Sequence, residues 1–209
     1  LNNGGTLVLP SASATLTGSL KDGLAVWLDA ADAASVERGP DGAVARWKDK
    51  SGHGRDAAQD CAAWRPRYLA DALNGHPALR FDDARRTRLE LPDLADQPVD
   101  ATVIAVISNP ESGQPGNQHQ RVFTSSDGKA HDYLCGIACN ISGPETGGPR
   151  TLTFEGQGRW AKCVRVGCFS PNDQTYFNGD ISEILVHTRR LTDAEKNRLA
   201  VYLMSKWNL

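Results

Sequence analysis

Tryptophan and arginine side chains are the residues of this chain best suited to binding a ligand. A sugar ring has apolar faces bordered by hydroxyl groups, so a glycan site combines an exposed aromatic side chain with polar neighbours. Trp64 lies in the segment AWRPR, and Trp160 follows the turn-forming segment GQGR. This placement favours exposure, although both rings covering the edge of the core is an open alternative. The residues that we expect to bind a glycan are Trp64, Arg65, Tyr133, Arg159 and Trp160.

Several arginines occur in or near the same segments, and they bear on the charge of a ligand. A cluster of guanidinium groups would favour an acidic glycan, because these groups pair with carboxylates. A solvated basic surface is the alternative for the same residues. The arginines concerned are Arg65, Arg67, Arg85, Arg86, Arg88 and Arg159.

The acidic residues do not follow the spacing of a glycoside hydrolase. Such an enzyme needs two carboxyl groups facing each other across a cleft, at about 5 to 10 Å. Asp180 and Glu183 are three positions apart, so they should face opposite sides of a regular strand. We expect Asp180 to lie in a turn and Glu183 to be solvated. The chain also lacks GxSxG, HExxH and phosphate-loop motifs, and we assign no catalytic residue.

Short β-prone segments separated by turn residues make up most of the chain. About ten such segments accompany a single amphipathic helix, a pattern typical of a β-sandwich or jelly roll. The apolar run from Ala101 to Ser108 is the best candidate for a central strand. We expect two hairpins, one joining segments 78–81 and 88–91, the other joining segments 151–155 and 160–169.

The C-terminal segment combines a strand with a helix. The run from Ile181 to Val186 is β-prone, and Thr192 and Glu195 fit a capping box at the start of a helix that extends to Trp207. The helix has an apolar stripe and should pack on the sandwich. The residues that we expect in the core are Trp27, Trp47, Phe81, Ile104, Val106, Ile184 and Leu203.

Five cysteines suggest disulfide bridges and one unpaired thiol. Cys135 and Cys139 lie on one predicted strand, and Cys163 and Cys168 lie on another. Cysteines four or five apart on a strand are roughly 13 to 17 Å apart, beyond the reach of a disulfide. We therefore expect one or both of the bridges between the strands, Cys135 with Cys168 and Cys139 with Cys163, and a free Cys61.

Three motifs in the same order resemble those of bacterial laminin-G-like, concanavalin A-like lectin/glucanase domains. They are GLAVWLDA followed by VARWKDKSGHG, then PALRFD, and the ending FNGDISEILVH with LTDAEK and YLMSKWNL. The resemblance implies an all-β, concanavalin A-like jelly-roll sandwich with one C-terminal α-helix over residues 21–209. Residues 1–20 would then be a linker or an edge strand.

The same resemblance implies a structural Ca²⁺ site in the loops. Asp29 and Asp32 fall in one predicted loop, and Asp49 opens another in the segment DKSG. Calcium takes carboxylate and carbonyl oxygens from flexible loops. The alternative is that these carboxylates cap turns.

Composition narrows the possible partners. The formal charge of −2 gives no global field that favours nucleic acid, and no run of eighteen apolar residues could span a membrane. The resemblance implies a non-catalytic carbohydrate-binding module, next to other domains of a secreted polysaccharide-degrading or cell-surface protein. The alternatives are a protein-binding adhesion or structural module, and a glycan lyase or hydrolase whose site the sequence does not reveal.

Overall fold

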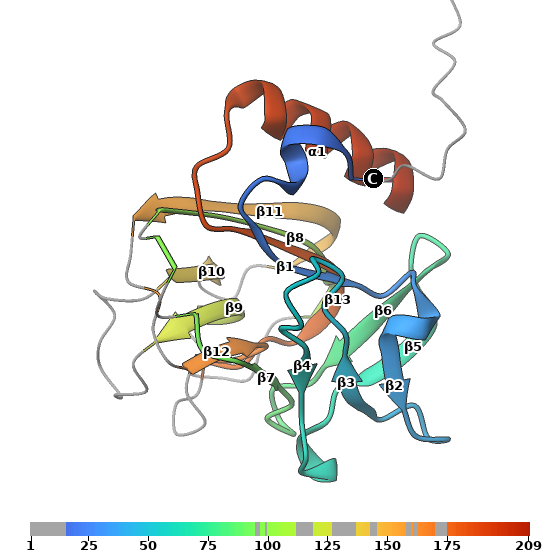
Figure 1. The fold of residues 1–209 in the computed structure, drawn as a ribbon. Helices are drawn as coiled ribbons and strands as arrows, with labels where there is room; N and C mark the ends of the chain where they lie inside the picture. Colours follow the sequence, from blue (N-terminus) through green and yellow to red (C-terminus); the bar gives the residue numbers. More distant parts are fainter. Residues whose placement is uncertain are drawn as a thin grey trace, which may run out of the picture.

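Two antiparallel β-sheets packed face to face form the body of the protein (Figure 1). The computed structural model describes residues 16–94, 97–98, 100–111, 119–126, 137–142, 146–157, 160, 163–169 and 175–209. In this part of the chain the α-helix α1 (Asp193–Trp207) lies over the outer face of one sheet, beside the short 3-10 helix η1 (Gly18–Lys21). The arrangement confirms the expected all-β sandwich with a C-terminal helix.

The first sheet, which we call sheet A, is arranged around strand β13. Its order is β11, β8, β13, β6, β5, and β1 also pairs with β13. One edge of β13 pairs with β8, while its other edge pairs first with β6 and then with β1. Strand β8 lies between β11 and β13, which confirms it as the predicted central strand. The strands are β1 (Leu24–Asp29), β5 (Arg67–Leu73), β6 (His76–Phe81), β8 (Asp100–Asn109), β11 (Gly147–Gln157) and β13 (Gly179–His187).

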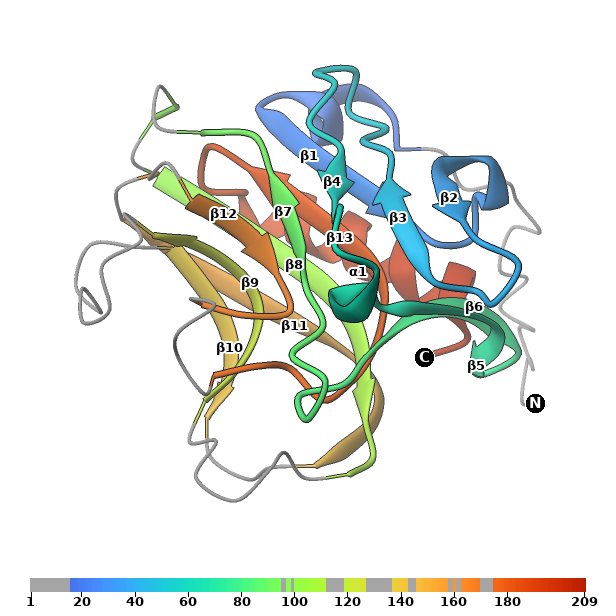
Figure 2. The same ribbon diagram turned by 90° about the horizontal axis from the view of Figure 1, so that it is seen from below.

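The second sheet, sheet B, lies below sheet A, and Figure 2 shows it from its own side. Its order is β10, β9, β12, β7, β4, β3, β2. Two further 3-10 helices, η2 (Ala33–Ser35) and η3 (Ala62–Trp64), lie in its loops. The strands are β2 (Val36–Arg38), β3 (Val44–Trp47), β4 (Ala57–Ala58), β7 (Leu89–Leu91), β9 (His119–Ser126), β10 (Ile137–Ser142) and β12 (Cys163–Val166).

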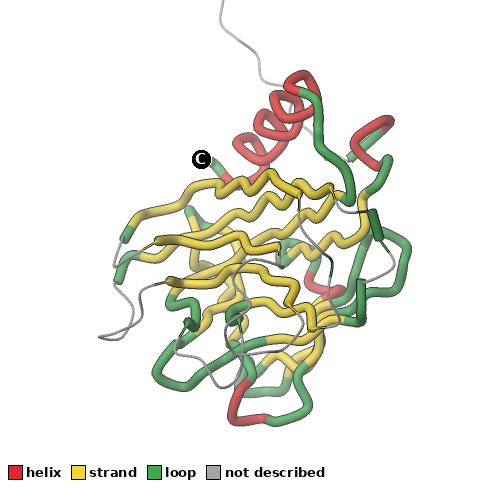
Figure 3. Tube along the Cα trace, turned by 90° about the vertical axis from the view of Figure 1, so that its left-hand side faces the viewer, coloured by secondary structure: helices red, strands yellow, loops and turns green. Residues whose placement is uncertain are grey.

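Two apolar layers stabilise the sandwich, one between the sheets and one beneath the helix. Figure 3 shows the helix above the stacked layers of strands. The main core includes the fully buried Trp47, Phe81 and Ile184. The second core lies between sheet A and α1. All seven expected core residues are buried, but they divide between the two layers because successive strand residues point to opposite faces. Those in the second core are Trp27, Ile104, Val106 and Leu203.

Helix α1 is defined by its two ends and by its buried side. Thr192 Oγ1 accepts a hydrogen bond from the backbone N–H of Glu195 at 3.3 Å, and the Glu195 carboxylate accepts one from the backbone N–H of Thr192 at 2.9 Å. The expected capping box is therefore confirmed. The helix ends at Asn208, which has the left-handed φ of 52° that asparagine tolerates. Leu199 and Trp207 are fully buried, and each such side chain contributes about 1.5–3 kcal/mol.

The segment before the first strand packs against the helix. Leu16 and Leu20 are buried in the second core. Residues 1–15 lie outside the described residues, so the domain boundary at residue 20 stays a prediction. No helix in the described part of the chain is long and apolar enough to cross a membrane.

Both expected hairpins are wrong, because the chain passes between the sheets at these points. β6 belongs to sheet A and the following β7 to sheet B. Likewise, β11 belongs to sheet A and β12 to sheet B. A polar turn between two β-prone segments permits either connection, and a sandwich uses many connections that cross between its sheets.

The positions of the cysteines do not allow all of the expected disulfide pairing. Strand β9 lies between β10 and β12, so it separates Cys139 from Cys163. Two strand spacings amount to roughly 9–10 Å, too far for a disulfide. Both thiols are free, and the Cys139–Cys163 bridge is wrong. Cys135 lies outside the described residues, so its pairing with Cys168 stays a prediction. Cys61 is confirmed as a free, exposed thiol.

Candidate functional site

A pocket lined by arginines lies near the end of strand β6, and we call it the arginine pocket. Its volume is about 180 Å³, and a smaller cavity of about 50 Å³ adjoins it through shared lining residues. The lining comes from the start of β5 and the segment that leads into it, the end of β6, the loop after β6, the segment after β8 and the segment before β13. Its polar residues include Arg65, Arg67, Arg80, Asp82, Arg85, Glu111 and Asn178.

Arg65 is held in place by main-chain carbonyl groups. Its Nε donates to the Gln59 carbonyl at 2.7 Å, and its Nη2 donates to the Asp60 carbonyl at 3.1 Å. Gln59 is itself buried, and its side-chain amide donates to the Arg88 carbonyl at 3.4 Å. Carbonyl groups fix the guanidinium without neutralising its charge.

Arg80 is fixed by a carboxylate on the neighbouring strand. Asp180, which is 1% exposed, accepts two hydrogen bonds from the guanidinium, at 2.6 Å from Nε and 2.7 Å from Nη2. This fork-like pairing is the strongest geometry that the two groups can form. It raises the pKa of Arg80, chiefly through the hydrogen bonds to Asp180. The Arg80 side chain remains 48% exposed and faces the pocket.

A compact loop between β6 and β7 carries Arg85. Asp82 Oδ1 accepts a hydrogen bond from the Arg85 backbone N–H at 3.1 Å, and Thr87 Oγ1 accepts one from the Asp82 backbone N–H at 2.7 Å. Arg86 has the left-handed φ of 57°. The Arg85 side chain is exposed and makes no hydrogen bond or ion pair with another described residue. Its guanidinium is therefore available to a ligand.

Trp64 lies immediately before Arg65, at the end of η3. Its side chain is exposed, with 39% of the residue surface accessible, as expected. The Arg88 guanidinium lies 4.0 Å from the ring centroid, and the Trp64 carbonyl accepts a hydrogen bond from the Arg88 backbone N–H at 2.9 Å. A stacked guanidinium limits the motion of the indole ring, which lies one residue before the lining residue Arg65 and does not itself line the pocket.

The other expected glycan-binding residues do not join this site. Trp160 is only 4% exposed and belongs to the main core, so its expected exposure is wrong and the alternative of core packing holds. Tyr133 and Arg159 lie outside the described residues. Of the five expected residues, Arg65 lines the pocket, and the exposed Trp64 precedes it in the chain.

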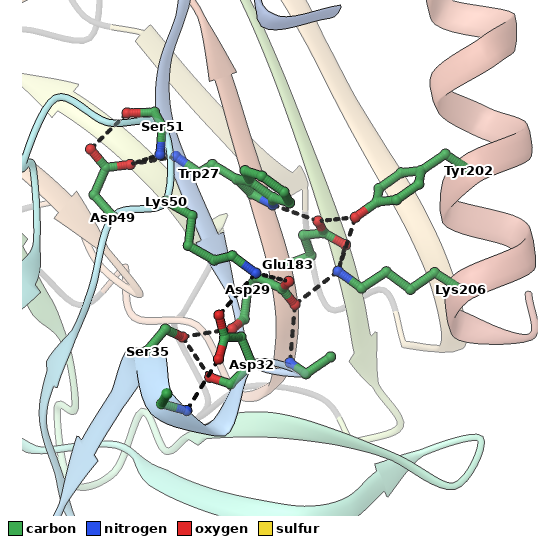
Figure 4. Close-up of polar contacts among 12 residues, drawn as sticks. Trp27, Asp29, Asp32, Ser35, Asp49, Lys50, Ser51, Glu183, Tyr202 and Lys206 are labelled. Atoms are coloured by element: carbon green, nitrogen blue, oxygen red, sulfur yellow. Dashed lines mark hydrogen bonds and ion pairs between the residues drawn. The ribbon is translucent and has the colours of Figure 1, made fainter. Parts of the chain in front are cut away.

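A second group of polar side chains lies buried beneath α1 (Figure 4). Glu183 of β13 is fully buried and accepts hydrogen bonds from Trp27 Nε1 at 2.7 Å, Trp207 Nε1 at 2.6 Å, Tyr202 Oη at 3.0 Å and Lys206 Nζ at 2.9 Å. Burial raises the pKa of Glu183 against the opposing effect of the Lys206 ammonium. Burial also raises the pKa of Tyr202, which keeps its hydroxyl protonated as a donor. The network joins β1, β13 and α1.

A β-bulge explains why Glu183 is not solvated. The pairing of β13 with β8 shifts register between Ile181 and Glu183, which makes Ser182 an extra residue. Ile181 and Ile184 consequently both face the main core although they are three positions apart. Asp180 and Glu183 lie together on the opposite face, 1% and 0% exposed. The expectations of opposite faces and of a solvated Glu183 are therefore wrong, and Asp180 lies within strand β13 and not in the expected turn.

The three aspartates expected to bind Ca²⁺ have other partners. Lys50 Nζ lies 2.8 Å from Asp29 and 3.1 Å from Asp32, and this ammonium lowers the pKa of Asp32. Asp49 instead accepts a hydrogen bond from the backbone N–H of Trp27 at 2.9 Å. The described residues contain no group of three or more His, Cys, Asp or Glu side chains that could hold a metal. The aspartates in this arrangement do not fit the expected calcium site.

Sequence reasoning missed the residues that join distant strands. Arg80 and Asp180 are direct neighbours across β6 and β13, a relation that only the strand pairing reveals. Tyr202 and Lys206 are four positions apart, so they share one face of α1. That spacing is visible in the sequence, but its buried acceptor, Glu183, is not.

Comparison with known proteins supports the fold and leaves the family open. No protein-family model matches the chain, and no curated protein matches it. It is similar to Trypanosoma rangeli sialidase in complex with sialic acid, with a TM-score of 0.52 and 14% identity over 88% of this chain. The same sialidase with the inhibitor DANA matches with a TM-score of 0.48 and 12% identity over 94% of this chain.

The chain spans about a third of the length of these solved structures, 33% and 34%. At 14% identity and a TM-score of 0.52, the likeness to the complex with sialic acid shows a shared β-sandwich fold and no more. Both structures are sialidases and neither is described as a laminin-G-like or concanavalin A-like domain, so that finer assignment stays a prediction.

Proposed function

We propose that this chain is a non-catalytic carbohydrate-binding module of a larger secreted polysaccharide-degrading or cell-surface protein. The observation that carries the proposal is the arginine pocket, whose lining residue Arg65 directly follows the exposed Trp64 in the chain. The ring offers an apolar face, and the guanidinium groups of Arg65 and Arg80 offer donors held in place by hydrogen bonds. A sugar requires this combination of an aromatic surface with fixed polar groups.

The likeness to sialidase supports the proposal indirectly. The match with the complex that contains sialic acid concerns a protein that acts on sugars and is about three times as long as this chain. A partial match of this kind suits a module that accompanies other domains. One fold hosts many functions, so the weight of the proposal rests on the pocket.

The buried carboxylates favour binding over catalysis. A lyase or hydrolase would need carboxyl groups that reach the substrate. Glu183 is fully buried, and Asp29 pairs with both Lys50 and Lys206 at 2.8 Å. These two groups hold β1, β13 and α1 together, which leaves them unsuited to act on a polysaccharide.

Binding to a panel of polysaccharides tests the proposal. We expect at least one polymer to retard the protein in affinity electrophoresis, and Trp64→Ala to weaken that binding about tenfold, equivalent to ~1.4 kcal/mol. Met204→Ala is the matched control, because Met204 is an apolar side chain on α1 that is 54% exposed. The control should bind as the wild type does.

Three results would argue against the module. Absence of binding to every polymer would favour the protein-binding adhesion alternative. Equal affinity of Trp64→Ala and wild type, with both folded by circular dichroism, would remove Trp64 from the site. Release of reducing ends during incubation would favour the lyase or hydrolase alternative.

A further inference from the structure

We propose that the arginine pocket binds the carboxylate of an acidic sugar residue. This inference rests on the proposed carbohydrate-binding function and adds the chemical class of the ligand. Four arginines line the pocket together with two acidic residues, Asp82 and Glu111. The local balance is therefore positive, although the whole chain carries a formal charge of −2.

The charges inside the pocket are not all compensated. Asp180 neutralises Arg80, whereas Arg65 is held by carbonyl groups and keeps its charge. The Arg67 Nη2 likewise donates to a carbonyl, that of Asp41, at 3.0 Å. Arg85 has no side-chain partner among the described residues. Arg65, Arg67 and Arg85 thus make no ion pair with a described residue, which favours an anionic ligand over a neutral one.

The acidic residues reduce this excess but do not cancel it, because Asp82, Glu111 and Asp180 are three carboxylates against four arginines. Asp82 Oδ1 is occupied by the backbone N–H of Arg85, at 3.1 Å. Glu111 is exposed and lines the smaller cavity together with Arg80. Its negative charge adds to the rise in the pKa of Arg80, the arginine that Asp180 already neutralises. An anion that enters the pocket can therefore approach Arg65 and Arg85 without replacing an existing ion pair.

Pre-organisation distinguishes this pocket from a solvated basic surface. Two of its guanidinium groups, those of Arg65 and Arg80, already make two hydrogen bonds each. Because these side chains are already fixed, less side-chain entropy is lost when a ligand binds. A planar guanidinium also matches a planar carboxylate better than it matches a compact charge.

The pocket is large enough to admit the carboxylate and part of the ring of a sugar residue. Its volume of about 180 Å³ is many times the roughly 10–15 Å³ that a cavity needs to hold one water molecule. Trp64 precedes Arg65 in the chain and is exposed without lining the pocket, so we expect its ring to contact an adjoining sugar of the polymer and not the one in the pocket.

Matched polymers test the inference directly. Polygalacturonate, alginate, hyaluronan and polysialic acid are each titrated beside a carboxyl-reduced form of the same polymer, and dextran sulfate is titrated beside dextran. We expect at least one carboxylated polymer to bind ten times more tightly than its reduced form. The difference should shrink at high salt, because exposed charges are screened.

Variants at Arg85 show whether the pocket is responsible. Arg85→Gln should weaken binding of that carboxylated polymer about fivefold or more, and Arg85→Lys should recover part of the loss because it keeps the charge. The Arg85 side chain is exposed and makes no hydrogen bond or ion pair with another described residue, so both variants should fold. Arg198→Gln is the charge-matched control, because Arg198 lies on α1 and is not among the residues that line the pocket.

The outcomes separate this inference from the proposed function. Equal binding of a polymer and its carboxyl-reduced form, or an unchanged affinity in Arg85→Gln, overturns the inference and leaves the module intact. Binding of dextran sulfate alone also overturns it, because the ligand would then be a sulfate. Absence of binding to any polysaccharide overturns both.

Discussion

Replacing Glu183 with glutamine tests how a buried carboxylate holds helix α1 on sheet A. In the wild type, one carboxylate oxygen accepts from Trp27 Nε1 and Tyr202 Oη, and the other accepts from Trp207 Nε1 and Lys206 Nζ. A carboxamide keeps the shape but replaces one acceptor oxygen with an NH₂ donor. In either orientation, at least one buried indole N–H loses its acceptor.

The magnitude follows from the hydrogen bonds that a glutamine cannot make. The more favourable orientation places the NH₂ group toward Tyr202, whose hydroxyl can rotate to accept, and leaves Trp27 Nε1 unsatisfied. An unsatisfied buried donor costs about 1–3 kcal/mol, and a lost hydrogen bond to a charged group costs about 1.5–3 kcal/mol. Removing a buried charge recovers part of its desolvation cost, and Lys206 keeps Asp29 at 2.8 Å. We expect a net loss of about 3 kcal/mol, or about 6–12 °C in melting temperature.

Thermal and urea unfolding of the variant measure this loss. Glu155→Gln is the matched control, because Glu155 also pairs with a lysine of α1, Lys196, at 3.1 Å, but its side chain is 33% exposed. Exposed ion pairs are screened by solvent and contribute little. A loss in Glu183→Gln no larger than the loss in Glu155→Gln would refute the role assigned to the buried network.

Three further predictions concern the protonation of His187, the reactivity of two cysteines and the aspartates expected to bind Ca²⁺. Burial lowers the pKa of His187 in the folded state below its value of about 6.5 in the unfolded chain. Keeping His187 neutral therefore contributes fully to the free energy of unfolding above about pH 6.5, and this contribution is lost as the pH falls. The melting temperature of the wild type should therefore drop more between pH 7 and 5 than that of His187→Gln, and parallel curves would contradict this. Cys61 should react with a maleimide at pH 8 long before Cys139, since Cys139 is buried and burial raises its pKa to about 12; equal labelling rates would show that β10 opens. Excess chelator should leave the melting temperature unchanged, because Lys50 lies between Asp29 and Asp32; a drop of several degrees would restore the calcium hypothesis.

The sequence predicts the parts of this fold that depend on local pattern. The capping box at Thr192, the strand around Ile104 and the burial of Trp47 each follow from residue types at short spacing. Trp64 and Arg65 can likewise be proposed as neighbours in a site because they are adjacent in the chain. These features require no knowledge of which strands pair.

What the sequence could not supply depends on pairing between distant strands. The bulge at Ser182 changes which residues of β13 face the main core, and no residue pattern in the sequence predicts it. The contact of Arg80 with Asp180 exists only because β6 lies beside β13. The residue pattern places Trp160 at a turn surface, yet the chain passes there from sheet A to sheet B and carries the ring into the main core.

The position of β13 also has a consequence for how the chain acquires its fold during synthesis. This strand ends at His187 and completes the pairing of β1, β6 and β8, and its contact with Trp27 closes a loop of 156 residues. Contacts between residues so far apart are slow to form. Before β13 leaves the ribosome, its three partners have open edges that can pair with other chains. Nascent chains shorter than this point should therefore need chaperone protection, and a premature stop before residue 187 should produce aggregates and not a smaller folded domain.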